Sequence, residues 1–271
     1  MLKILVFVLS AVSAFAQSTA VSQISGIVTD GSGAAVPGAQ VTITNIDTAA
    51  ARSIDTTADG AYVVTNLPVG PYRLQVTKSG FAGYNQTGIV LQVNSNPAIN
   101  VALKVGAVSE QIEVSANAAM VETSNNTVGQ VIDRQRVIEL PLNGRNVTQL
   151  IALSGAAVAS SPGGIVNNLN YPTVAAYSVA GGQGNATNYF LDGGSHIDPR
   201  TNVGLPLPYP DALQEFKLET STLPANYGSL PGGAVNVVTR SGTNALHGGL
   251  FYFVRNDAMN AGISLPPPAI P

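Results

Sequence analysis

Short runs in which apolar and polar residues alternate recur over the first hundred residues of the chain and predict β-strands. Tyr72, Leu74 and Val76, for example, fall on one face of such a run, and Gly/Pro/Asp-rich turn sequences separate each run from the next. The seven predicted strands span residues 23–29, 39–45, 53–57, 61–65, 72–77, 89–93 and 99–103. Seven short strands at this spacing predict a β-sandwich over residues 22–105.

The pattern becomes mixed in the second half of the chain. Helical spacing at 133–140 and 147–153, with Asn146 placed to cap the second helix, predicts two short helices, and 210–213 predicts a helical turn. Gly, Ala, Ser and Asn dominate residues 154–170, which predicts a flexible loop. The predicted strands span residues 126–131, 177–180, 215–220, 234–239 and the aromatic run 246–255. This order predicts an α+β domain over residues 120–245.

Composition supports a mainly β, exported protein. The chain has 271 residues, enough for about two domains, and only 10% of them are charged. A net charge of −3 argues against a nucleic-acid partner. The chain contains no Cys, so disulfides do not contribute to its stability.

The first residues predict a secretory signal peptide over residues 1–16. Lys3 supplies the positive charge, 4–9 is an apolar core, and Ala14-Phe15-Ala16 is a small-x-small site before Gln17. The alternative, a membrane anchor, needs a longer apolar run than this segment provides.

Residues 26–81 resemble the carboxypeptidase regulatory-like domain, a transthyretin-like or starch-binding-like sandwich. The resemblance is carried by turn and core positions, so it implies a fold and not a chemistry. The matching positions are Gly26, Val28, Asp30, Gly33, Pro37-Gly38-Ala39, Val41, Asp59-Gly60, Tyr62, Leu67-Pro68, Gly70, Tyr72 and Gly80-Phe81. Phe81 and Tyr84 form either a carbohydrate-stacking pair or ordinary edge packing.

The second half resembles the plug domain of TonB-dependent outer-membrane receptors. Tyr227-Gly228, Gly232-Gly233 and the run VNVVTR at 235–240 match the end of that plug, where the first barrel strand follows. The sequences ELPLNGRN at 139–146 and QLIALSGA at 149–156 resemble the plug entry of the Oar-like subgroup. The resemblance implies a plug domain over 120–245 and the start of a barrel strand and a truncated tail over 246–271.

The linker at 106–119 contains a segment similar to the TonB box of these receptors. Its positions are Glu110, Ile112, Val114 and Ala116. Such a segment would bind a periplasmic energiser by adding a strand to the sheet of that partner. An ordinary connecting strand is the alternative interpretation.

Two further side chains are candidate ligand contacts in the plug, Arg145 and Asp192. Arg145 is alternatively a structural residue bonded to loop carbonyls, and Asp192 precedes a glycine that favours a turn. The loop at 192–198 lacks the spacing of a calcium-binding loop, and no catalytic motif accompanies His196 or His247. We therefore expect no enzymatic activity, no cofactor and no metal.

The resemblance implies the N-terminal part of a receptor at the cell outer membrane, on its periplasmic side, that gates ligand uptake. Its partners would be a TonB-type energiser, a β-barrel that this sequence lacks, and a carbohydrate or peptide ligand. One alternative is a secreted or periplasmic carbohydrate-binding module without transport activity. Another is an accessory domain of an enzyme.

Overall fold

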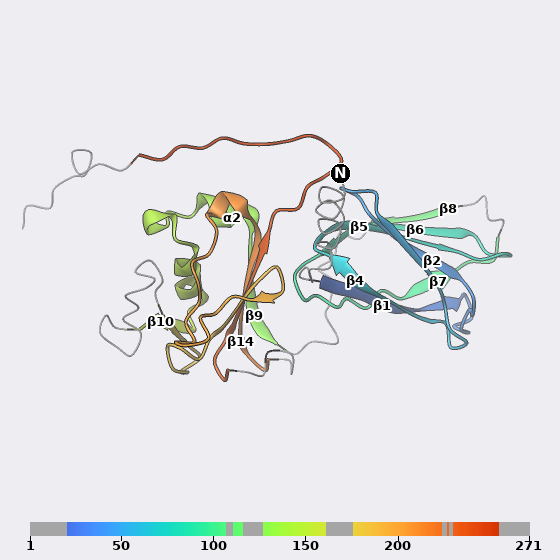
Figure 1. Ribbon diagram of the computed structural model, residues 1–271. Helices are drawn as coiled ribbons and strands as arrows, with labels where there is room; N and C mark the ends of the chain where they lie inside the picture. Colours follow the sequence, from blue (N-terminus) through green and yellow to red (C-terminus); the bar gives the residue numbers. More distant parts are fainter. Residues whose placement is uncertain are drawn as a thin grey trace, which may run out of the picture.

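The protein forms two β-rich domains that lie side by side (Figure 1). The computed structural model describes residues 21–106, 111–115, 127–160, 176–223, 227 and 230–254. Strands dominate the described residues, so the predicted mainly β fold class is confirmed. The predicted signal peptide, residues 161–170 of the predicted loop, and the tail beyond 254 lie outside the described residues.

The first domain packs a three-stranded sheet against a five-stranded one. In the first sheet, β1 pairs antiparallel with β4 and parallel with β7. The order in the second sheet is β3-β2-β5-β6-β8. The strands are β1 (Val21–Asp30), β2 (Gln40–Asn45), β3 (Ala51–Asp55), β4 (Ala61–Pro68), β5 (Gly70–Thr77), β6 (Gly83–Leu91), β7 (Val101–Leu103) and β8 (Gln111–Ser115). All seven predicted strands of the sandwich are present.

The alternation seen in the sequence places one face of each strand in a common core. Val41, Ile43, Leu74 and Val76 are essentially inaccessible to solvent, as the pairing of apolar faces between two sheets requires. The two buried phenols of this core also find partners, because the Tyr62 hydroxyl donates to the Ile99 carbonyl oxygen at 2.6 Å and the Tyr72 hydroxyl to the Pro68 carbonyl oxygen at 2.8 Å.

The second sheet extends beyond the predicted domain boundary at residue 105. Strand β8 comes from the segment predicted as a linker and pairs in parallel with β6, with Tyr84 opposite Ile112 and Gln86 opposite Val114. Strand β6 also begins at Gly83, before the predicted start at residue 89. Its first half is polar, so backbone pairing with β5 and β8, and not apolar alternation, defines it as a strand.

The second domain is built on a five-stranded sheet in the order β13-β12-β15-β14-β9. Strand β12 runs parallel to β15, and the remaining neighbours are antiparallel. A separate two-stranded sheet joins β10 to β11. The elements are β9 (Val128–Asp133), α2 (Arg134–Glu139), η2 (Asn143–Arg145), η3 (Val147–Ser154), β10 (Ala157–Ala159), β11 (Tyr177–Val179), β12 (Asn188–Leu191), β13 (Gly194–Ser195), η4 (Pro210–Ala212), β14 (Leu213–Ser221) and β15 (Ala234–Thr239).

Side-chain caps fix the starts of the two main helical segments. Asp133 accepts a hydrogen bond from the Arg136 amide at 3.0 Å and begins α2. The predicted cap Asn146 is confirmed, because its Oδ1 accepts from the Thr148 amide at 3.0 Å. The segment that it caps is a 3₁₀ helix and not an α-helix.

Two predictions of secondary structure were wrong within the described residues. Residues 157–159 were predicted as part of a flexible loop, but they form a strand that pairs with β11. In this pairing Val158 lies opposite Ser178. The aromatic run 246–254 was predicted as a strand, but it has no strand assignment and its Leu246 and Leu250 are fully exposed. A strand needs a hydrogen-bonded neighbour, and within the described ranges this run has none.

The Gly26→Ala substitution should destabilise the first domain by about 1–3 kcal/mol, as overpacking does in other cores. A β-carbon at Gly26 would lie 1.9 Å from the Ile99 carbonyl oxygen, at the contact between β1 and the segment before β7. Urea unfolding of the full chain, followed by circular dichroism, measures this effect.

Gly31→Ala is the matched control, because a β-carbon there meets nothing within 4 Å. This control should change stability by less than about 0.5 kcal/mol. Equal unfolding midpoints for the two variants would contradict the close approach at Gly26.

Candidate functional site between the two domains

A tight turn of the first domain, residues 92–95, projects from the end of β6 onto the second domain. The Gln92 carbonyl oxygen accepts from the Ser95 amide at 3.1 Å, and Asn94 has a φ of 54°. Asn tolerates this left-handed conformation better than most residues. The Ser22 hydroxyl donates to the Gln92 carbonyl oxygen at 2.6 Å, which ties the turn to β1. The turn is therefore a rigid extension of the sandwich.

Strand β14 receives this turn through two charged side chains. The Val93 amide donates to Glu215 Oε1 at 2.9 Å, and Lys217 Nζ donates to the Val93 carbonyl oxygen at 3.1 Å. Both backbone groups of one residue are thus satisfied by side chains 122 and 124 positions away. The Val93 side chain is buried against Val238 and Val69, so the contact is apolar on one side and ionic on the other.

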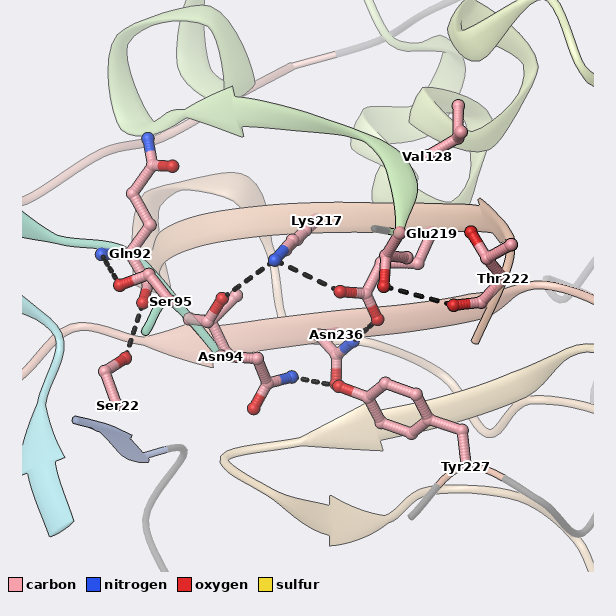
Figure 2. Close-up of polar contacts among 12 residues, drawn as sticks. Ser22, Gln92, Asn94, Ser95, Val128, Lys217, Glu219, Thr222, Tyr227 and Asn236 are labelled. Carbon is pink, nitrogen blue, oxygen red and sulfur yellow. Dashed lines mark hydrogen bonds and ion pairs between the residues drawn. The ribbon is translucent and has the colours of Figure 1, made fainter. Parts of the chain in front are cut away.

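A second carboxylate completes the charge balance around Lys217 (Figure 2). Lys217 Nζ lies 3.1 Å from Glu219 Oε1 in an ion pair without hydrogen-bond geometry, and the Glu219 side chain is fully buried. Asn236 Nδ2 donates to the other oxygen, Glu219 Oε2, at 3.4 Å. Burial of an unpaired charge costs several kcal/mol, so Lys217 and Glu219 each require the other.

Tyr227 joins this cluster from the loop between β14 and β15. Its hydroxyl accepts a hydrogen bond from Asn94 Nδ2 of the turn (Figure 2). Asn188 Nδ2 donates to the Tyr227 carbonyl oxygen at 3.2 Å, and the Phe190 ring centroid lies 5.1 Å from the Tyr227 ring centroid. Tyr227 therefore connects the turn of the first domain to β12 of the second.

Burial changes the acid–base properties of this cluster. Desolvation raises the pKa of Glu215 to about 7, although the hydrogen bond from Val93 and the charge of Lys217 act in the opposite direction. Desolvation likewise raises the pKa of Tyr227, and the nearby Glu219 charge adds to that rise. Near neutral pH, Glu215 is therefore the group in this contact that exchanges its proton.

The two domains also touch beside this cluster. Asn244, in the segment after β15, donates from its amide to the Asp47 carbonyl oxygen at 3.1 Å and from Nδ2 to the Thr48 carbonyl oxygen at 2.8 Å. A cavity of about 220 Å³ lies next to this contact and is lined by residues of both domains, including Arg52 and Arg240. Both charged side chains are exposed to solvent there.

The structure places the predicted TonB-box segment on the first domain. Ile112 and Val114 lie in β8, the edge strand of the second sheet, with Glu113 exposed between them. Glu110 and Ala116 lie outside the described residues. The segment is extended, and its neighbour is a strand of its own sandwich.

Arg145 and Asp192 each have partners within the second domain. Arg145 Nη2 lies 2.5 Å from Asp211 Oδ2, and its guanidinium carbon lies 3.9 Å from the centroid of the Phe253 ring. Asp192 has a φ of 50° and accepts from both the amide and the hydroxyl of Thr239, each at 2.8 Å. The predicted turn at Asp192 is confirmed, and the partner of Arg145 is a carboxylate and not the predicted loop carbonyls.

The remaining sequence candidates take structural positions. Phe81 and Tyr84 are partly buried against the sandwich core, and the Tyr84 hydroxyl donates to Gln86 Oε1 at 2.9 Å. His196 Nε2 lies 3.1 Å from the Pro206 carbonyl oxygen in an exposed loop. Across the part of the chain that the structure describes, no three His, Asp or Glu side chains cluster as a metal site would require. No helix in that part is both long and apolar enough to cross a membrane.

Sequence reasoning did not single out Glu215, Lys217, Glu219 or Tyr227 as functional. Charges at alternate positions of one strand are usually interpreted as a solvated face, and the covering turn is more than 120 residues away. One signal for a buried Glu219 is the glycine at position 129 in β9. A β-carbon there would lie 3.2 Å from Glu219 Cγ, so the position beside Glu219 has little room for a side chain. The carboxylates, amine, amides and phenol of this cluster can hold a backbone segment through hydrogen bonds.

Removal of the central cation tests this network. Lys217→Met should destabilise the protein by about 3–5 kcal/mol, because it leaves Glu219 buried without a counter-charge. The Lys217→Met/Glu219→Gln double variant should recover part of this loss. Urea unfolding of the full chain measures both effects.

The exposed Lys104 provides the control, and Lys104→Met should change stability by less than about 0.5 kcal/mol. If Lys217→Met were as stable as this control, the buried ion pair would not be holding the cluster together.

Comparisons with known proteins match the first domain and, separately, most of the chain. Residues 23–104 match the family of carboxypeptidase regulatory-like domains. Over 241 residues, 88% of the chain, the sequence is 29% identical to the TonB-dependent transporter Oar of Myxococcus xanthus. The match covers 22% of that relative, so the chain spans about a fifth of its length.

Among solved structures, the chain resembles parts of several β-rich proteins. A streptococcal ancillary pilin is similar over 33% of this chain and 34% of its own, with 19% identity and a TM-score of 0.27. Hydroxyquinol 1,2-dioxygenase from Pseudomonas putida is similar over 34% of this chain and 58% of its own, with 8% identity and a TM-score of 0.28. Scores at this level carry no functional argument. The first domain is thus similar to carboxypeptidase regulatory-like domains, and most of the chain is similar to a TonB-dependent transporter.

Proposed function

We propose that this chain is the N-terminal portion of a TonB-dependent outer-membrane transporter, in which the second domain is a plug that gates ligand uptake. The observation that carries the proposal is the 29% identity to the transporter Oar over 88% of the chain. Residues 1–16 would direct export, and the plug would act inside a β-barrel. No covalent chemistry is needed, because gating is a movement of the plug relative to its barrel.

The segment at 110–116 is the proposed contact with the periplasmic energiser. Strand β8 supports this role because it is the edge strand of its sheet, so one side of its backbone faces away from β6. Edge strands can add to the sheet of a partner protein through backbone hydrogen bonds. Glu113 is exposed and Val114 half-buried, which leaves side chains on this strand accessible to such a partner.

The lack of Cys in the natural sequence allows a cross-linking test in the natural host. A cysteine introduced at Glu113 should form a disulfide with a cysteine placed in the energiser. A cysteine at the exposed Asp59, in a turn of the sandwich, should not. Adding Val114→Pro should lower the yield about fivefold, as expected when one backbone hydrogen bond of about 1 kcal/mol is lost.

Val114→Ala is the matched control, because it keeps the backbone amide and should retain cross-linking. Recovery of the protein in the outer-membrane fraction is the second readout. A protein that stays out of that fraction, never cross-links to the energiser and instead binds glycans would refute the transporter proposal and favour a carbohydrate-binding module.

A further inference from the structure

We propose that the 92–95 turn and the side chains of Glu215 and Lys217 form a releasable latch between the two domains, and that protonation of Glu215 sets how firmly it holds. The proposal is independent of the transport function, because it concerns only contacts within this chain. It goes beyond the gating role, in which the two domains have no assigned connection.

The geometry of Val93 is that of a clamp. Its amide and its carbonyl oxygen are held by two side chains on one face of β14, at 2.9 Å and 3.1 Å. The Glu215 and Lys217 residues are each only 7% exposed. Because both side chains are buried, water has little access to replace either hydrogen bond while the turn is docked. The two hydrogen bonds hold the same residue, so loss of one weakens the other.

The latch lies directly on the path between β8 and the second domain. Strand β8 pairs with β6 along five residues, and β6 leads without a break into the 92–95 turn. The 92–95 turn is hydrogen-bonded to β14, an inner strand of the sheet of the second domain, with β15 on one side and β9 on the other. Release of the turn would therefore remove the direct contact between the strand that pairs with β8 and the sheet of the second domain.

Burial of Glu215 determines the direction of the pH effect, against the opposing influence of Lys217. On its own strand, Lys217 and Glu219 are the charged neighbours. Strand β9 contributes Asp133, opposite Glu215 in register. Tyr227, from the loop between β14 and β15, interacts with Glu219 and not with Glu215 itself. The turn contributes no titratable group, since its residues are Gln92, Val93, Asn94 and Ser95.

The docked turn therefore favours a neutral Glu215. In the docked state the pKa of Glu215 is about 7, against 4.5 for a solvated carboxyl. A folded-state pKa above the solvated value means that the docked state binds the proton more tightly. The contribution of Glu215 to docking is complete below pH 4.5 and is lost as pH rises through about 7. The neutral carboxyl still accepts the hydrogen bond from the Val93 amide through its carbonyl oxygen.

Hydrogen exchange of the Val93 amide in the full chain tests the latch directly, since that amide is the donor to Glu215. After correction for the intrinsic pH dependence of exchange, protection should fall by up to about tenfold per pH unit between about pH 5 and pH 7. It should then level off. In Glu215→Gln, protection should not change with pH, because the amide oxygen of Gln accepts the same hydrogen bond without titrating.

Three controls make the result specific. Glu139→Gln, at an exposed carboxylate on α2, should keep the wild-type pH dependence. Lys217→Met should lower protection of the Val93 amide but keep its slope with pH. The amides of Leu74 and Val235, in the two cores, report global unfolding, so a variant that unfolds is recognised.

Wild-type protection at Val93 that does not change between pH 5 and pH 8, or an unchanged slope in Glu215→Gln, would overturn the proposal. Should the variant unfold, the wild-type slope at Val93 compared with that at Leu74 decides the question alone. A failed latch would leave the transporter proposal untouched, because membrane fractionation and energiser cross-linking do not depend on it.

Discussion

Burial of both faces of β14 is the constraint on which the arrangement of the two domains depends. One face places Phe216 and Leu218 in the core of the second domain, as expected for apolar residues at alternate positions. The other face carries Glu215, Lys217 and Glu219, which are nearly inaccessible to solvent. Charged groups tolerate such burial only when they are paired and hydrogen-bonded. The 92–95 turn supplies part of that pairing, so the first domain completes the second.

This arrangement differs from two domains joined by a free linker. The segment predicted as a linker begins with β8, which belongs to the sheet of the first domain. The next strand that the structure describes is β9, the neighbour of β14 in the second domain. The latch and the linker therefore meet the same strand of the second domain. If the segment containing β8 is the contact for a periplasmic energiser, its nearest connection to the plug passes through the latch as well as through the chain.

Much of the fold could be predicted from the sequence, because local patterns determine it. Alternation at Tyr72, Leu74 and Val76 and the turn at Asp59-Gly60 were sufficient to find the sandwich. Strand β8 as part of that sandwich was not predictable, because its partner β6 is polar where the two strands meet. Strand β10 was missed because Ala157 to Ala159 has no alternation, and it becomes a strand only through pairing with β11.

The candidate site was harder to predict than the fold. Nothing local distinguishes Lys217 from a surface lysine, since its partners are the Val93 backbone, 124 residues away, and a carboxylate of its own strand. Arg145 illustrates the same difficulty, because Asp211 and Phe253 are both distant in sequence. The aromatic residues at 251–253 have a local preference for strand, which is why a strand was predicted there. Without a neighbouring strand, these residues do not form a β-strand. Phe251 and Phe253 pack against each other instead, with ring centroids 5.8 Å apart.

The most direct test of the account is a distance measurement between the two domains. Spin labels on cysteines introduced at Asp59 in the sandwich and at Val158 in β10, both exposed and in a chain without natural Cys, report the distance by double electron–electron resonance. The account predicts one narrow distance distribution at pH 6 for the otherwise unaltered chain. It predicts a broad distribution when both Glu215 and Lys217 are replaced by Ala. A broad distribution in the chain with Glu215 and Lys217 intact would contradict the latch, because the docked turn would then not hold the two domains in one arrangement.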